Sequence, residues 1–331
     1  MKLKSKIIFL ILCNIISFQI YGMSKSNRVN VKIRNYKGWE ESVEIDNGCL
    51  KIVVVPSISR IMYFGLSGDE NLLWNNDTLL GENIKYTDKL LNKHYWANYG
   101  GDKVWNMEQR NFPEVLGRGW PPDEYFDGGR YEYDLLENGV QITSQVSEYT
   151  NTFLTRKITT TPGSKRVNIA QTITCARKHS VVPATFWNVT QAKPPLKYII
   201  DRNQNSKFKG NLKYFMEKFD PDMEILDGNM IIENIENDTV KIGSDSKEFL
   251  AAVYDDKIFV QSFQYEENKK YPDDGCTIEI FINPRFVELE LLSYLKMMEE
   301  GESLNYNIQW SLDGLDSMDK EYLVKKVEEL K

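Results

Sequence analysis

The chain is poor in the residues that most metal sites and many catalytic centres need. Its 331 residues include two histidines, His94 and His179, which leave little material for a multi-histidine zinc site or a Ser-His-Asp triad. The four cysteines are far apart in the sequence, and no two have the spacing of a metal-binding or redox motif. We therefore expect no metal and no cofactor.

Basic runs are also missing. The formal net charge is −7, from 41 Lys and Arg against 48 Asp and Glu. An acidic surface repels phosphate backbones and anionic lipid, and no basic stretch is interleaved with aromatic residues. We expect no nucleic-acid partner.

No apolar run is long and clean enough for a membrane span, which needs about 20 residues. The first 22 residues instead combine three early lysines with an interrupted apolar stretch, which is the layout of a signal peptide. We expect cleavage after Gly22 and a secreted or periplasmic protein without a stable membrane span. A lipoprotein attached through Cys13 is the alternative, and it is less favoured because Leu12 is bulky where a small residue is expected.

Apolar and polar residues alternate in many short stretches between about residues 40 and 312. This period of two is typical of half-buried strands. The alternating positions are Ile52 and Val54; Val140 and Ile142; Val167, Ile169 and Ile173; Ile278, Ile280 and Ile282; and Leu304, Tyr306, Ile308 and Trp310. Turn sequences such as Asn138-Gly139 and Pro162-Gly163 separate the stretches, and no strand–helix–strand pattern appears. We expect an all-β, antiparallel sandwich or barrel.

The same patterns predict the organisation of the chain. Residues 23–39 are expected to be a lead-in, residues 40–315 one β domain and residues 316–331 a closing helix. Residues 92–130 are rich in Gly, Pro, Trp and Asn and lack clean periodicity, so we expect them to cross one face of a sheet as a functional loop. The helix is predicted by an apolar stripe at helical spacing, formed by Tyr322, Leu323, Val327 and Leu330.

The irregular segment contains the densest candidate site. It includes Tyr99-Gly100-Gly101-Asp102-Lys103-Val104-Trp105, and Gln109, Trp120 and Asp123 follow. Indole faces stack on the C–H face of a sugar ring, while carboxylate, amide and ammonium groups bind its hydroxyls. We expect Asp102, Trp105, Gln109, Trp120 and Asp123 to bind a carbohydrate. The alternative is that both tryptophans only anchor the loop and that Asp102 and Lys103 form a solvated pair.

Two later strands add candidates. In the segment 186–191, Trp187 and Asn188 either bind the substrate or belong to an ordinary strand. In the segment 286–291, alternation puts Glu288 and Glu290 on the same face. An acid on such a face is suited to act as general base for a sugar hydroxyl, although a solvated strand face has the same pattern.

Several motifs together resemble a known family. The segment 43–56, Arg60 and the segment 70–74 (ENLLW) are similar to the start of galactose mutarotase-like (aldose 1-epimerase-like) proteins. Glu288 or Glu290, the turn at 300–303 and Trp310 resemble the late acid, the turn and the final strand of that superfamily. The Tyr-Gly-Gly-Asp-Lys-x-Trp element and Trp120-Pro121-Pro122-Asp123 are similar to an uncharacterised, DUF4380-type branch.

The resemblance extends over residues 40–312 and implies a β-supersandwich with a short C-terminal helix. It also implies that a mono- or oligosaccharide binds on the concave face of the larger sheet, with Arg60 in the site. Enzymes of this superfamily open the sugar hemiacetal with a histidine acid and a glutamate base. Here Tyr99 stands in the Tyr-Gly-Gly element where a histidine is expected, and the segment 186–189 has no histidine either. Glu288 or Glu290 is left as candidate base, with Lys103 or Tyr99 as candidate acid.

Three functional hypotheses follow from these residues. The first is a carbohydrate-binding protein without catalysis, which the loss of both histidine positions favours slightly. The second is an aldose 1-epimerase-type isomerase that interconverts sugar anomers. The third is a polysaccharide lyase or glycoside hydrolase, for which Asp102 and Glu288 are the candidate acid–base pair.

Overall fold

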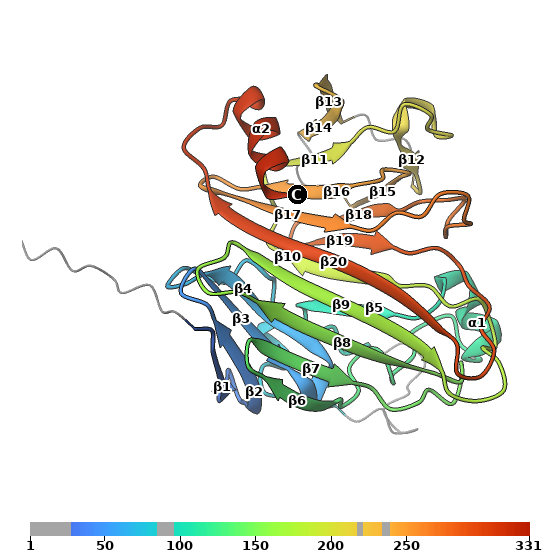
Figure 1. The fold of residues 1–331 in the computed structure, drawn as a ribbon. Coiled ribbons are helices and arrows are strands. Elements are labelled where there is room, and N and C mark those ends of the chain that lie inside the picture. Colours follow the sequence, from blue (N-terminus) through green and yellow to red (C-terminus); the bar gives the residue numbers. More distant parts are fainter. Residues whose placement is uncertain (1–27, 85–95, 217–220, 234–238) are drawn as a thin grey trace, which may run out of the picture.

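The computed structural model describes residues 28–84, 96–216, 221–233 and 239–331. The predicted signal peptide and His94 lie outside these ranges. The described chain forms two antiparallel sheets of ten strands each, with two α-helices and short 3-10 turns (Figure 1). Within these residues no helix is both long enough and apolar enough to cross a membrane.

The first sheet, which we call the site sheet, brings together strands that are far apart in the sequence. In spatial order they are β1 (Asn30–Tyr36), β2 (Trp39–Asp46), β3 (Leu50–Val55), β4 (Arg60–Leu66), β5 (Asp102–Trp105), β10 (Trp187–Ala192), β19 (Val287–Leu292), β18 (Ile278–Ile282), β15 (Val240–Ser244) and β12 (Lys213–Tyr214).

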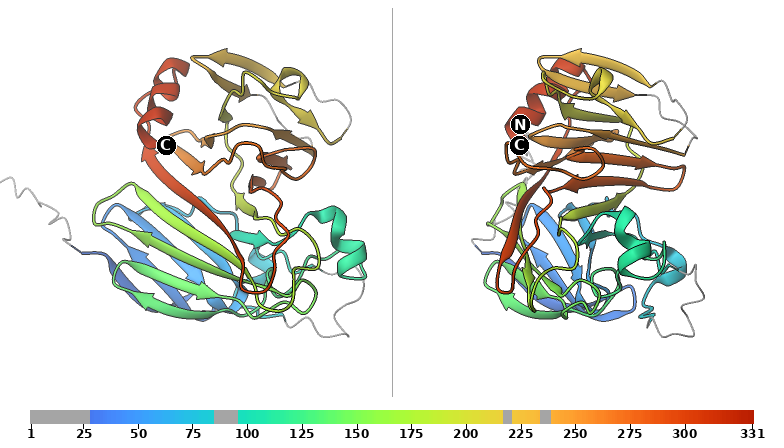
Figure 2. Two further views of the ribbon diagram at one scale, coloured as in Figure 1. Left: turned by 45° about the vertical axis from the view of Figure 1, so that its right-hand side comes forward. Right: turned by 90° about the vertical axis from the view of Figure 1, so that its right-hand side faces the viewer.

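The second sheet, which we call the back sheet, packs against the site sheet. Its strands are β13 (Asp222–Leu226), β14 (Asn229–Glu233), β11 (Lys197–Asp201), β16 (Phe249–Val253), β17 (Lys257–Phe263), β20 (Ser303–Gly314), β9 (Arg166–Cys175), β8 (Thr152–Thr160), β7 (Gly139–Thr143) and β6 (Glu132–Leu136). Strands β1 to β4 and β6 to β9 are seen as two layers in Figure 2.

The main hydrophobic core lies between the two sheets, and the alternating positions read from the sequence provide it. Ile52, Val140, Ile169, Ile280 and Tyr306 belong to this one buried cluster. The predicted sandwich and its strands are therefore confirmed. Helix α2 (Lys320–Leu330) closes the other side of the back sheet by burying Leu323, Val324, Val327 and Leu330 against it.

Two strands lie where the sequence predicted none. Strand β1 falls inside the expected lead-in. Val31 and Ile33 alternate there with polar residues, but the stretch is short and most of its side chains are exposed. Strand β5 falls inside the expected loop and pairs with β4 and β10. All four of its residues are buried, and two of them are charged, so neither face of the strand is recognisable as apolar.

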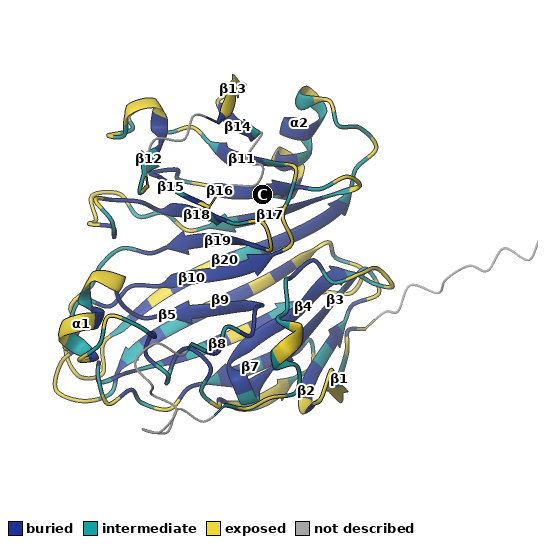
Figure 3. Cartoon of the chain, turned by 180° about the vertical axis from the view of Figure 1, so that it is seen from behind, coloured by how far each residue is buried: buried dark blue, intermediate teal, exposed yellow. Residues whose placement is uncertain are grey.

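Helix α1 (Phe112–Val115) and the segments around it cover part of the site sheet on the face turned away from the back sheet (Figure 3). We call this face the outer face. Phe112 and Leu116 pack there against Trp105, Trp187 and Leu292. Both sheets have ten strands in the described chain, so strand number does not single out a larger one.

Candidate functional site

Strand β5 divides its side chains between the two faces of the site sheet. Asp102 and Val104 point toward the interior, where Val104 joins the main core. Lys103 and Trp105 point to the outer face, and Trp105 packs there with Trp187. The same alternation puts Gln191 of β10 and Glu288 and Glu290 of β19 on the outer face.

The centre of the candidate site is the pair Lys103 and Glu288. Lys103 Nζ lies 3.7 Å from Glu288 Oε1, and the Lys103 side chain is fully buried whereas that of Glu288 is 12% exposed. Gln191 Nε2 donates a hydrogen bond of 2.7 Å to the same Oε1 atom. Among the residues that the structure describes, Lys103 Nζ has no hydrogen-bond partner. A buried ammonium in this state has unused donors, and Glu288 is the member of the pair that a ligand reaches first.

Burial shifts the two groups in opposite directions. Loss of hydration lowers the pKa of Lys103, while the nearby Glu288 carboxylate acts against that shift. Loss of hydration also raises the pKa of Glu288, and Lys103 opposes it. The two pKa values therefore move toward each other.

A second ionic cluster adjoins this pair on the outer face. Lys241 Nζ contacts Glu279 Oε2 at 2.7 Å and Glu290 Oε2 at 3.1 Å. Trp187 Nε1 donates a 2.5 Å hydrogen bond to the same Glu290 oxygen. Burial opposes the charged form of Lys241, but the two carboxylates outweigh it and raise the pKa of the ammonium. Both acids have a cation and a hydrogen-bond donor beside them, but the Glu290 side chain is 2% exposed and that of Glu288 is 12% exposed, so Glu288 is the acid that a ligand can reach.

A third ion pair lies beside the tryptophan side chains of the site. Arg60 is buried and forms an ion pair with Asp127. The other Asp127 oxygen accepts hydrogen bonds from Trp96 Nε1 at 3.0 Å and Trp105 Nε1 at 2.9 Å. Asp127 therefore fixes two indole rings and one guanidinium together, and Arg60 also donates to the Gly100 carbonyl oxygen at 3.0 Å.

Aromatic rings surround the Lys103 ammonium. Its Nζ atom lies 5.2 Å from the Trp96 ring centre and 5.8 Å from that of Trp105. Trp120 meets Trp96 and Trp105 edge to face, at centroid distances of 5.0 and 5.7 Å. Trp96 and Trp120 are partly exposed whereas Trp105 is almost buried, so the first two present ring surface to a ligand.

Two predicted binding residues point away from this site. Asp102 lies between the sheets, where it forms an ion pair with Arg156. Asn188 Nδ2 donates to Asp102 Oδ2 at 2.6 Å, and the Thr190 hydroxyl donates to the same atom at 2.9 Å. Asp102 and Glu288 are therefore on opposite faces of the sheet, and the acid–base pair required by the lyase or hydrolase hypothesis is not assembled.

Three further candidates are also placed elsewhere. The Tyr99 ring packs against Trp39 at a centroid distance of 6.2 Å, and its hydroxyl accepts the Ile84 N–H at 2.9 Å. Gln109 is exposed in the 3-10 turn before α1. Asp123 is buried, where it accepts a 2.6 Å hydrogen bond from the Ser147 hydroxyl. Of the proposed acids, Lys103 alone is in the site.

Sequence reasoning missed several members of the site. Trp96 and Asp127 fall within the tryptophan-rich segment but were not singled out there. Glu279 alternates with Ile278 and Ile280, which is a signal that would have placed it on the outer face. Lys241 alternates with Val240 and Ile242 in the same way, but its contact with Glu290 and that of Gln191 with Glu288 depend on which strand lies beside which.

Metal ligands and disulfides are not part of this arrangement. Within the described residues, no three His, Cys, Asp or Glu side chains are grouped so as to hold a metal ion. Among the described residues, Cys175 and Cys276 are buried and have free thiols. His179 is exposed, in an isolated bridge with Glu299.

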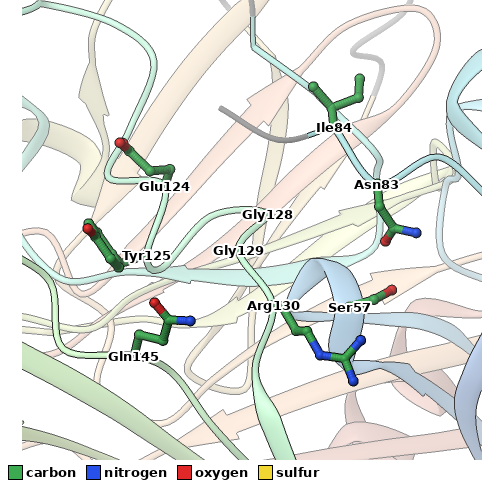
Figure 4. Close-up of a pocket in the computed structure, with 9 residues that line it drawn as sticks. All are labelled: Ser57, Asn83, Ile84, Glu124, Tyr125, Gly128, Gly129, Arg130 and Gln145. Atoms are coloured by element: carbon green, nitrogen blue, oxygen red, sulfur yellow. The ribbon is translucent and has the colours of Figure 1, made fainter. Parts of the chain in front are cut away.

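A cavity of about 560 Å³ lies beside the segment that carries Asp127 (Figure 4). It is lined by Ser57, Asn83, Ile84, Glu124, Tyr125, Gly128, Gly129, Arg130 and Gln145. Its charged groups already have partners, because Glu124 pairs with Arg118, and Arg130 pairs with Glu41 at 2.7 Å. None of the predicted site residues lines it, and the ionic and aromatic cluster on the outer face remains the better candidate.

The fold is similar to that of several solved proteins. A proposed aldose 1-epimerase from Escherichia coli K12 matches with a TM-score of 0.54 and 11% identity, over 87% of this chain and 100% of that one. A proposed aldose 1-epimerase from Klebsiella pneumoniae matches with a TM-score of 0.59 and 10% identity, over 91% and 87%. A galactose mutarotase-like protein from Lactobacillus casei gives 0.53 and 11%, over 82% and 100%.

The sequence itself matches no family model and no curated protein. At 10 to 11% identity, the structural similarity establishes the architecture and leaves the activity to be argued from the site. The chain therefore has the galactose mutarotase-like fold.

Proposed function

We propose that the protein binds a carbohydrate on the outer face of the site sheet, with Glu288 as the central acceptor of sugar hydroxyl groups. The observation that carries this proposal is the Lys103–Glu288 pair, in which a partly exposed carboxylate and an ammonium with unused donors lie beside the Trp96 and Trp120 indoles. Polar groups of both kinds next to aromatic surface suit a polyhydroxylated ring. The mutarotase-like fold is consistent with this use of the face.

The charges favour a neutral sugar. Arg60 pairs with Asp127, Lys103 with Glu288, and Lys241 with Glu279 and Glu290. Each of these cations already has a carboxylate partner. An anionic sugar would have to compete with a protein carboxylate for its counter-charge, whereas hydroxyl groups only need hydrogen-bond partners.

Isothermal titration calorimetry of the full chain with glucose, galactose, mannose, xylose and their linear oligomers tests this proposal. We expect binding of at least one series and a loss of affinity of about tenfold or more in Glu288→Gln, because a neutral amide replaces a charged acceptor. Glu132→Gln, an exposed strand glutamate of the back sheet, is the matched control. Absence of binding to every sugar, or equal loss in the control, would overturn the proposal.

A second candidate is interconversion of sugar anomers, which the opposed pKa shifts of Lys103 and Glu288 favour. In that reaction Glu288 removes the proton of the anomeric hydroxyl and Lys103 donates a proton to the ring oxygen, so that the ring C–O bond breaks and an open aldehyde forms. Ring closure on the opposite face of the aldehyde gives the second anomer, with Glu288 returning its proton to the new anomeric hydroxyl and Lys103 regaining its own. Proton NMR of freshly dissolved α-glucose and α-galactose measures the rate directly, and acceleration that survives Glu288→Gln would exclude this mechanism.

We also propose that the protein is exported, on the basis of the signal-peptide layout of residues 1–22. Fractionation of cells that express the full chain, with mass measurement of the product, tests this. A mature mass that corresponds to cleavage after Gly22 is expected, and an uncleaved chain in the cytoplasm would contradict the proposal.

A further inference from the structure

A second group of aromatic side chains lies on the same face, on the other side of Glu288. We call Trp74, Phe281 and Phe286 the second aromatic patch. The Trp74 and Phe286 ring centres are 4.5 Å apart, and those of Phe281 and Phe286 are 6.4 Å apart. Trp74 and Phe281 are partly exposed whereas Phe286 is 7% exposed. Two of the three rings therefore present surface, and the third supports them.

Strand register places this patch directly beside the acid. Phe281 of β18 is the cross-strand partner of Glu288. Phe286 belongs to the segment that leads into β19 and has the same parity as Glu288, while Val287 between them points into the core. The Trp74 N–H donates to the carbonyl oxygen of Gln191, whose side chain binds Glu288. All three aromatic residues therefore lie on, or hydrogen-bond to, strands at or next to the Lys103–Glu288 pair.

The first aromatic group lies on the other side of the pair. Trp105 belongs to β5, and β10 and β19 separate β5 from β18, the strand of Phe281. Three steps between neighbouring strands correspond to about 14 Å across the sheet, and Trp105 is level with Leu292, four residues along β19 from Glu288, the partner of Phe281. That span is longer than one hexose ring, and Glu288 lies within it. A single sugar stacked on the Trp96 and Trp120 side would leave the second aromatic patch uncovered.

We infer that the site takes a linear carbohydrate of at least three units, with one unit stacked on the Trp96–Trp120 side and a unit farther along the chain on the second aromatic patch. This inference rests on the proposed carbohydrate-binding function. Glu288 lies between the two stacking surfaces and binds hydroxyl groups near the linkage. Partly exposed indole and phenyl rings are costly to leave in water, and a sugar C–H face covers them without requiring charge.

Calorimetry with the same sugars, extended from one to six units, tests the inference. The wild-type affinity is expected to rise about tenfold or more between one and three or four units, because a unit farther along the chain gains its own stacking surface. In Trp74→Ala this gain with length should be reduced to less than about threefold, whereas Trp74→Phe should retain most of it. Tyr322→Ala, a half-buried aromatic of α2 on the opposite side of the molecule, is the control and should retain the full gain.

The outcomes separate the two proposals. If the wild-type protein binds no sugar of any length, the proposed function fails and the inference fails with it. If it binds single sugars as tightly as their oligomers, or if folded Trp74→Ala keeps the full gain with length, the inference alone is overturned. Should Trp74→Ala not fold, Phe281→Ala replaces it, because Phe281 is partly exposed and lies on a different strand of the same patch.

Discussion

Asp102 and Lys103 are neighbours on one strand, and both are charged and fully buried, yet their surroundings differ completely. Asp102 lies between the sheets, where Arg156, Asn188 and Thr190 all donate to its carboxylate. Lys103 lies on the outer face, where, within the described part of the chain, its ammonium has one carboxylate at 3.7 Å and no hydrogen bond. Burial of a charge is therefore not itself a sign of function. The difference lies in whether the protein already satisfies the group.

The largest expected effect on stability is at Asp102, the charge that already has hydrogen-bond and ion-pair partners in the protein. Asp102→Asn removes the charge that compensates Arg156 and should lower the free energy of unfolding by about 3–5 kcal/mol, because it leaves a cation buried between the sheets. Denaturant titration measures the loss. Asp134→Asn, on an exposed position of the edge strand β6, should change stability by less than about 0.5 kcal/mol. A loss below about 1 kcal/mol in Asp102→Asn would show that the interior pair is not structural.

Asp123 sharpens the comparison, because it is a buried acid whose closest partners are neutral. Its carboxylate accepts hydrogen bonds from the Ser147 hydroxyl and the Tyr125 N–H, and burial raises its pKa to about 7. An acid with a raised pKa binds its proton more tightly in the folded state. Its contribution to stability is therefore complete at low pH and is lost as the pH rises from about 4 to about 7.

Asp123→Asn should remove this pH dependence. Between pH 5 and pH 8 the wild-type protein should lose about 2–3 kcal/mol of unfolding free energy relative to the variant. Denaturant titrations at both pH values, with Asp134→Asn as the control, measure the difference. Parallel pH profiles of wild type and variant would mean that Asp123 is ionised throughout, as expected for an acid that has a cationic partner.

The limits of sequence reasoning follow from the same strands. Many strands of the sandwich and helix α2 were predictable because apolar residues recur along them at the spacing of a strand or a helix. The turns were predictable from their Gly, Pro and Asn residues. Strand β5 was not, because Asp102 and Lys103 put a buried charge on each face, and the hydropathy pattern of a strand disappears when ion pairs replace apolar contacts. The sequence indicated that this segment contains charged and aromatic residues of a candidate site. It did not indicate which of the two adjacent charged residues, Asp102 or Lys103, lies on the outer face.

The choice between Glu288 and Glu290 shows a similar limit. Both were predicted on one face of a strand, and the structure places them there. Their different roles come from the strands beside them, because Lys241 and Trp187 engage Glu290 whereas Lys103 and Gln191 engage Glu288. Strand order across the sheet is a long-range property, and no local pattern encodes it.

A smaller loss of stability is expected at Lys103 than at Asp102, and this prediction tests the comparison between the two residues most directly. Lys103→Met keeps a long apolar stem and removes an ammonium that makes no hydrogen bond, while Glu288 can take up a proton when its cation is removed. The free energy of unfolding should therefore fall by less than the about 3–5 kcal/mol that removal of one partner of a buried ion pair usually costs. Carbohydrate affinity should fall about tenfold, because a Glu288 that takes up a proton is a weaker acceptor of sugar hydroxyl groups than the carboxylate.

Denaturant titration and calorimetry on the same Lys103→Met sample separate the two readouts, and Lys157→Met on an exposed position of β8 is the matched control. A destabilisation as large as that of Asp102→Asn, without loss of affinity, would make Lys103 a structural charge like its neighbour. The two faces of β5 would then be equivalent, and Lys103 would no longer be part of the candidate site.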